Sequence, residues 1–140
     1  MPTWSNWAGN QKSHPSVSER PASESEVIAV VNRAVSNKQR VKVVGSGHSF
    51  TGIAVPDEVM VDLSKLNQIV DIDRTRGLVT VQAGIVLSDL NAHLEAQGLS
   101  MPNLGDVTYQ TGAGAVSRAH IRHQDFSRPP RPGRRAGICL

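Results

Sequence analysis

Cysteine, aromatic residues and long apolar runs are all scarce in this 140-residue chain. The single cysteine, Cys139, excludes an internal disulfide framework and a cysteine-based metal site. No apolar run reaches the roughly 18 residues of a membrane-spanning helix. The first residues lack the basic region and apolar stretch of a secretory signal, so we expect a cytoplasmic location. The length suffices for about one domain with a hydrophobic core.

Positive charge is concentrated at the C-terminal end. The net charge is +3, yet residues 1–117 carry nine basic and eleven acidic side chains. Residues 118–140 carry six arginines and one acid, Asp125. A basic arm for nucleic acid is one interpretation, but only Phe126 is available for base stacking and no recognition fold precedes it. We therefore expect no nucleic acid partner. His120 and His123 lack a convincing third ligand, so we expect no metal site.

Hydrophobic periodicity predicts a small α+β domain with mixed strand directions. A capping box of Ser23 and Glu26 precedes apolar residues at helical spacing, which predicts a helix over 24–37. A short strand ended by Pro21 is predicted at 17–20, and mainly apolar segments predict strands at 41–44 and 59–63. The strand at 41–44 is expected to be buried on both faces and to follow the helix in a right-handed βαβ crossover.

Glycines at turns predict the ends of the remaining elements. Strands at 69–73 and 78–81 flank a turn that ends at Gly77, which predicts a hairpin. A second helix is expected over 86–97, with Gly98 at its C-terminal end. Residues 1–16 are expected to form an irregular arm, which Trp4 and Trp7 dock onto the body of the domain.

A glycine-rich loop follows the predicted strand 41–44 and reads Gly45-Ser46-Gly47-His48-Ser49-Phe50. Glycine lets the backbone approach a ligand closely, and successive N–H groups in such a loop can form an anion-binding concavity. The third glycine of a dinucleotide-binding turn and the Gly-Lys-Ser/Thr of a P-loop are missing. These residues alone leave two alternatives open, a phosphate cradle beside a nucleophilic imidazole or an ordinary turn. Residues 105–115 are also rich in glycine, and two interpretations stay open for them: a backbone contact with a ligand, or tight packing of small residues.

Four separated segments together resemble the FAD-binding domain of the vanillyl-alcohol oxidase-type flavoproteins. Within that family the sequence is most similar to the sugar-lactone branch, the gulonolactone and arabinonolactone oxidases and dehydrogenases, with alditol oxidases close by. The resemblance extends over residues 3–117 and implies an N-terminal fragment of a longer flavoprotein. The segments that carry it are residues 4–10 (WSNWAGN), 44–50 (VGSGHSF), 77–84 (GLVTVQAG) and 105–117.

The resemblance implies a division of the chain. Residues 1–16 would be an N-terminal arm, and residues 17–104 a first FAD-binding subdomain. Residues 105–117 would begin a second FAD-binding subdomain. Residues 118–140 form a tail that departs from the family.

The resemblance also implies residue roles. Backbone N–H groups of residues 43–49 would hold the FAD pyrophosphate, with the hydroxyls of Ser46 and Ser49 as further donors. His48 matches a position that many relatives join covalently to the flavin, and covalent and non-covalent binding both stay open here. Positions in the second subdomain would line the FAD from the other side. The implied cofactor-binding residues are Val43, Val44, Gly45, Ser46, Gly47, His48, Ser49, Asp106, Thr111 and Gly114.

The family's reaction is the oxidation of a CH–OH carbon, in a sugar-1,4-lactone or an alditol, by hydride transfer to flavin. The substrate domain and its catalytic residues are absent from this sequence. The chain is therefore expected to be the FAD-binding portion of such an oxidoreductase. The alternative is a truncated, non-catalytic remnant with weak or no FAD binding.

The departure from the family begins at Arg118. Relatives continue after Ser117 with residues such as Thr-Gly-Thr-His, whereas this chain reads Arg118-Ala119-His120-Ile121. Codons for the latter, read one base earlier, can encode Thr-Gly-Thr-His. We therefore predict that residues 118–140 are a frameshifted reading. We expect this tail to be largely disordered, because its apolar content is too low to offset the entropy of ordering.

Overall fold

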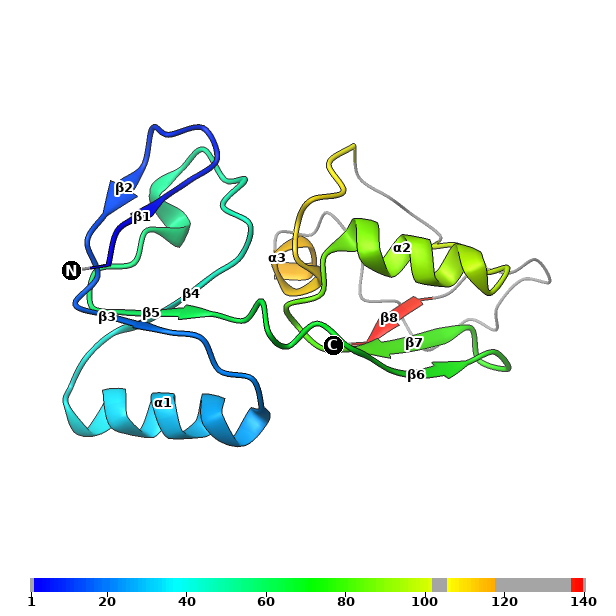
Figure 1. Cartoon of the computed structure of the whole chain (residues 1–140), viewed down its shortest axis with the longest axis horizontal. Helices are drawn as coiled ribbons and strands as arrows, with labels where there is room; N and C mark the ends of the chain where they lie inside the picture. The colour runs from blue at the N-terminus through cyan, green and yellow to red at the C-terminus, as the bar shows by residue number, and fades with distance from the viewer. Residues whose placement is uncertain (1, 102–105, 118–136, 140) are drawn as a thin grey trace. The chain divides into compact units, whose positions relative to one another are not determined.

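The computed structural model describes residues 2–101, 106–117 and 137–139. The chain divides into two compact units, Met1–Leu66 and Asn67–Leu140 (Figure 1), and each has its own hydrophobic core. The predicted α+β class is confirmed. None of the described helices is long and apolar enough to cross a membrane. Most of the predicted tail, with His120 and His123, lies outside the described residues, and the domain boundaries at 16, 104 and 117 stay predictions.

The first unit is built on a three-stranded parallel sheet in the order β3-β5-β4. Its strands are β3 (Val17–Glu19), β4 (Val41–Val44) and β5 (Val59–Asp62). The βαβ prediction is right in sequence order, but β5 lies between β3 and β4. The prediction that 41–44 is buried on both faces is wrong, because β4 is an edge strand and Val43 is 51% exposed. The central strand of the sheet is β5, and its Val59 and Val61 are buried.

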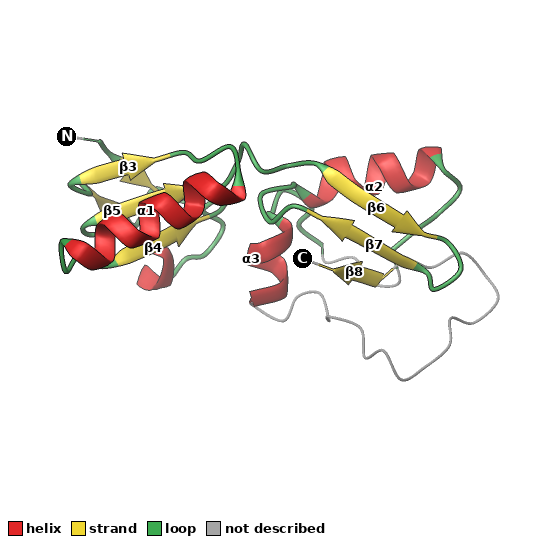
Figure 2. Ribbon diagram, turned by 90° about the horizontal axis from the view of Figure 1, so that it is seen from below, coloured by secondary structure: helices red, strands yellow, loops and turns green. Residues whose placement is uncertain are grey.

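Helix α1 (Glu24–Ser36) covers one face of this sheet (Figures 1 and 2). The Ser23 hydroxyl accepts a hydrogen bond from the Glu26 N–H at 3.2 Å, as the capping box predicts. The Glu26 carboxylate accepts from the Ala22 N–H at 2.7 Å. Val30 and Ala34 pack on the sheet and form the core of this unit with Val59 and Val61.

The second unit contains the predicted hairpin and helix. Strands β6 (Ile69–Asp73) and β7 (Leu78–Val81) are antiparallel, and Gly77 adopts the positive φ of +66° that the turn requires. Strand β8 (Gly137–Cys139) pairs parallel to β7. Helix α2 (Leu87–Ala96) ends where Gly98 adopts a φ of +70°, which confirms the predicted C-terminal position. A further helix, α3, spans Gly112–Ser117.

The N-terminal arm is less irregular than predicted. Strands β1 (Trp4–Ser5) and β2 (Lys12–Ser13) form a short antiparallel pair, on the side of the first sheet opposite α1 (Figure 1). Trp4 is buried, in accord with its predicted docking role. Trp7 is 69% exposed, but it also docks the arm, because its indole stacks on the His48 ring of the glycine-rich loop.

Candidate functional site

The glycine-rich loop (residues 45–50) begins where β4 ends, at the buried Val44. Gly47 has a φ of +70°, a backbone conformation that residues with a Cβ atom rarely adopt. A Cβ at this position would stand 3.3 Å from the Cα of Asn6 and 3.5 Å from the backbone nitrogen of Trp7. Gly47 is therefore required both by its backbone conformation and by the close approach of the N-terminal arm.

The arm donates hydrogen bonds to the carbonyl oxygens of this loop. All of the donors lie in a single segment, the N-terminal turn (residues 6–11), and they engage three loop carbonyls. The Trp7 N–H donates to the Gly47 oxygen at 2.9 Å, Asn6 Nδ2 to the Ser49 oxygen at 2.9 Å, Asn10 Nδ2 to the Phe50 oxygen at 3.1 Å and Gln11 Nε2 to the same oxygen at 3.4 Å.

The backbone N–H groups of the loop are used differently. Within the described ranges, those of Ser46, Gly47, Ser49 and Phe50 donate to no hydrogen bond of the protein. The Ser49 hydroxyl pairs with the Thr51 hydroxyl at 3.0 Å. Consecutive N–H groups around a positive-φ residue form a concavity that attracts anions. The loop therefore has its Gly47, Ser49 and Phe50 carbonyls occupied by the arm and several N–H donors available.

His48 lies in the middle of the loop and is half-buried. Its ring stacks on the indole of Trp7, with ring centroids 5.6 Å apart and planes inclined by 25°. The Phe50 ring meets the same indole edge to face at 6.2 Å. The imidazole that the sequence singled out is thus held between the loop backbone and an aromatic side chain of the arm.

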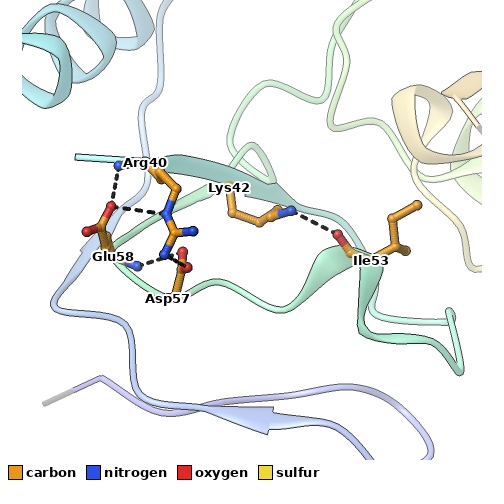
Figure 3. Close-up of polar contacts among 5 residues, drawn as sticks. All are labelled: Arg40, Lys42, Ile53, Asp57 and Glu58. Atoms are coloured by element: carbon orange, nitrogen blue, oxygen red, sulfur yellow. Dashed lines mark hydrogen bonds and ion pairs between the residues drawn. The ribbon is translucent and has the colours of Figure 1, made fainter. Parts of the chain in front are cut away.

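The segment that follows the loop is fixed to β4 and β5 by charged side chains (Figure 3). Lys42 Nζ donates to the Ile53 carbonyl at 3.1 Å, which ties the short helix η1 (Gly52–Ala54) to β4. At the other end of β4, the Arg40 guanidinium pairs with Asp57 and Glu58. The ion pairs of Arg40 therefore join the two ends of residues 40–58, and the Lys42 hydrogen bond fixes η1, which follows the glycine-rich loop, to β4.

The second group of predicted site residues lies in the second unit. Asp106 is exposed, and the Thr111 hydroxyl accepts a hydrogen bond from the Gly114 N–H at 3.2 Å, at the start of α3. A Cβ at Gly114 would stand 3.0 Å from that hydroxyl oxygen. Residues 108–113 are fixed to residues 83–88 by backbone hydrogen bonds, including Gly112 N–H to the Ile85 oxygen at 2.7 Å.

Asn6 is the functional candidate that sequence reasoning missed. It is the buried polar residue of the described core, with 5% exposure, and it contacts the loop across 43 positions of sequence. The segment 4–10 contributed to the family resemblance, which was the available signal. Nothing in its local pattern indicates which of its polar residues points inward.

Known proteins share sequence with most of this chain. The family model described as "FAD binding domain" matches residues 15–127. The chain is 45% identical over 130 residues to the L-gulono-1,4-lactone dehydrogenase of Mycobacterium tuberculosis, covering 90% of this chain and 30% of that protein. It is 41% identical over 111 residues to the L-gulonolactone oxidase of Scyliorhinus torazame, covering 79% and 25%. The chain thus spans less than a third of the length of these curated relatives.

Solved structures share the fold. A solvent-stable cholesterol oxidase superposes with a TM-score of 0.71 at 30% identity, over 81% of this chain and 23% of that one. The family match extends to residue 127, beyond Ser117. The prediction that family-like sequence ends at Ser117 is therefore tested with the sequence of the gene. Because the family model covers most of the chain, this chain belongs to the FAD binding domain family.

Proposed function

We propose that the glycine-rich loop binds the pyrophosphate of FAD through its backbone N–H groups. The observation that carries this proposal is the division of the loop's polar groups. The N-terminal turn occupies the carbonyls of Gly47, Ser49 and Phe50, which would otherwise repel a phosphate. The N–H groups of Ser46, Gly47, Ser49 and Phe50 make no bond within the described protein. Residues 43–49, which the family resemblance assigns to the pyrophosphate, include most of this donor set.

The loop itself contains no lysine or arginine, so the attraction for phosphate comes from oriented peptide dipoles. Such dipoles act strongly on an anion held at close range. Lys42, the nearest cation in sequence, is engaged with the Ile53 carbonyl. Because the family resemblance assigns further FAD contacts to Asp106, Thr111 and Gly114, outside the loop, we propose that the loop alone binds the nucleotide weakly.

The activity that we propose for the whole protein is that of a sugar-lactone or alditol oxidoreductase. Support comes from the lactone dehydrogenase and oxidase relatives. When bound, the flavin supplies the acceptor for a hydride from a CH–OH carbon. This chain's residues would hold and orient the cofactor, and His48 is the candidate for covalent attachment. The alternative is a non-catalytic remnant with weak or no FAD binding.

Titration of the purified chain with FAD, ADP and flavin mononucleotide tests the proposal. FAD and ADP share the pyrophosphate, so both should bind, and flavin mononucleotide should bind at least tenfold more weakly. Equal affinity for all three, or no binding of FAD and ADP, would contradict the assignment. Reduction of an acceptor dye in the presence of a sugar-1,4-lactone then separates an active portion from a remnant.

Covalent attachment has its own test. If flavin remains with the chain after acid precipitation, His48→Ala should release it. His93→Ala is the matched control, because it removes an exposed imidazole on α2, outside the loop. Acid-stable flavin in the His48→Ala variant would exclude this residue as the attachment point.

A further inference from the structure

We propose that Asn6 is a positioning residue that holds the glycine-rich loop in its anion-binding conformation. The proposal rests on the proposed FAD-binding function and adds a residue outside the loop to its machinery. Asn6 lies in the N-terminal turn, where its side chain reaches the Ser49 carbonyl and its backbone approaches Gly47 closely. Its role is therefore exerted on the loop backbone.

The side-chain amide of Asn6 is buried and its hydrogen bonds are complete. Nδ2 donates to the Ser49 carbonyl at 2.9 Å and to Asn10 Oδ1 at 2.7 Å, and Oδ1 accepts from the Gln11 N–H at 3.0 Å. An amide has two N–H donors and one carbonyl, and each has a partner here. An aspartate of the same shape would keep the Gln11 contact but lose both donations.

The backbone of Asn6 also shapes the N-terminal turn. This turn contacts the Gly47 carbonyl, which precedes His48 in sequence, whereas the Asn6 side chain contacts the Ser49 carbonyl, which follows it. The Asn6 N–H donates to the Gln11 oxygen at 3.1 Å, and the Gly9 N–H donates to the Asn6 oxygen at 3.1 Å. This closed turn presents the Trp7 N–H to the Gly47 oxygen. Asn6 and its turn thus fix the two carbonyls that flank His48 in sequence.

Fixing these carbonyls also sets the direction of N–H groups. In a trans peptide the C=O and the following N–H point in opposite directions, and no cis peptide occurs among the described residues. Because the Ser49 carbonyl points to Asn6, the Phe50 N–H points away from the arm. The same holds for the peptide between Gly47 and His48. The arm therefore sets the direction of these loop N–H groups, which point away from the arm.

The test compares Asn6→Ala and Asn6→Asp with the wild-type chain. Asn32→Ala is the matched control, since Asn32 is an exposed asparagine on α1. The first readout needs no ligand: backbone ¹⁵N order parameters of residues 46–50. In the wild type these should be near the rigid value of about 0.85, and in both Asn6 variants they should fall below about 0.6. Amides of α1 should not change.

The second readout is affinity. Loss of the donation to the Ser49 carbonyl should raise the Kd of FAD and of ADP about tenfold, which is the effect of one lost hydrogen bond of about 1.4 kcal/mol. Asn6→Asp should behave like Asn6→Ala, because both lack the donor. A purely structural role would lower the unfolding midpoint and leave loop order and affinity unchanged in the folded variants.

Asn10→Ala is used if Asn6→Ala does not fold. Asn10 is exposed, accepts from Asn6 Nδ2 and donates to the Phe50 carbonyl, so its removal should loosen the loop part-way. Unchanged order parameters in a folded Asn6 or Asn10 variant would overturn the proposal. If the wild type binds neither FAD nor ADP, the proposed function fails, and the order parameters still decide whether Asn6 positions the loop.

Discussion

Trp7 stacks on the imidazole of His48, with 5.6 Å between the ring centroids, although the two residues are 41 positions apart in the chain. The indole is 69% exposed, so burial does not explain its position. The contact holds the one imidazole of the glycine-rich loop against the N-terminal turn. Its strength can be measured directly.

We expect Trp7 and His48 to be energetically coupled. In a double-mutant cycle of Trp7→Ala and His48→Ala, the coupling in the free energy of unfolding should be about 0.5–1 kcal/mol, as for other aromatic pairs. Urea denaturation provides the measurement. Trp7→Ala combined with His93→Ala, a histidine of α2, is the control and should be additive. Additive effects for Trp7 and His48 would show that the stacking contributes nothing.

Gly47→Ala should destabilise the chain more than Gly9→Ala. Both glycines have a φ of +70°, so both variants incur the strain of about 1–2 kcal/mol for a left-handed residue with a Cβ. A Cβ at Gly9 meets nothing within 4 Å, whereas one at Gly47 stands 3.3 Å from the Asn6 Cα. Urea unfolding compares the two. Equal losses would mean that the arm yields to the added methyl group at no cost.

Lys38→Gly should stabilise the first unit. Lys38 has a φ of +54° and closes the C-terminal end of α1, where its N–H donates to the Val35 oxygen at 3.0 Å and the Gln39 N–H to the Ala34 oxygen at 2.8 Å. Glycine relieves the left-handed strain, for a net gain of about 0.5–1 kcal/mol. Asn37→Gly is the control and should not stabilise, since Asn37 has a φ of −88°. The unfolding midpoint in urea reports both.

Leu90→Ala should lower the stability of the second unit by about 2–5 kcal/mol, the range for a buried leucine. Leu90 is fully buried in the core formed by β7 and α2. Val70→Ala is the control, because Val70 is 63% exposed on β6, and its effect should stay below about 1 kcal/mol. Hydrogen exchange of β6 and β7 amides assigns the loss to this unit. Similar effects of the two substitutions would contradict the described core.

The frameshift prediction is tested at the gene. We expect the DNA after codon 117, read in another frame, to continue the flavoprotein sequence, beginning with residues such as Thr-Gly-Thr-His. An intact frame, or the same Arg/Pro-rich tail in close relatives, would show that residues 118–140 belong to the protein as they stand.

Local signals predicted much of the fold. The cap of Ser23 with the N–H of Glu26, the turn at Gly77 and the helix end at Gly98 all depend on residues within four positions of one another. The loop around Gly47 was found for a similar reason, since its glycines and histidine are consecutive. The burial of 41–44 was predicted wrongly, because an apolar run does not reveal whether other elements cover both faces of the strand.

By itself the sequence determined helices α1 and α2, the hairpin and the glycine-rich loop, because short-range hydrogen bonds and side-chain periodicity encode them. Only the tertiary structure decided that β5 lies between β3 and β4, that Asn6 reaches the Ser49 carbonyl and that Trp7 covers His48. Such contacts join segments about 40 positions apart. They are selected by the competition among all possible pairings in the folded chain, which no local pattern records.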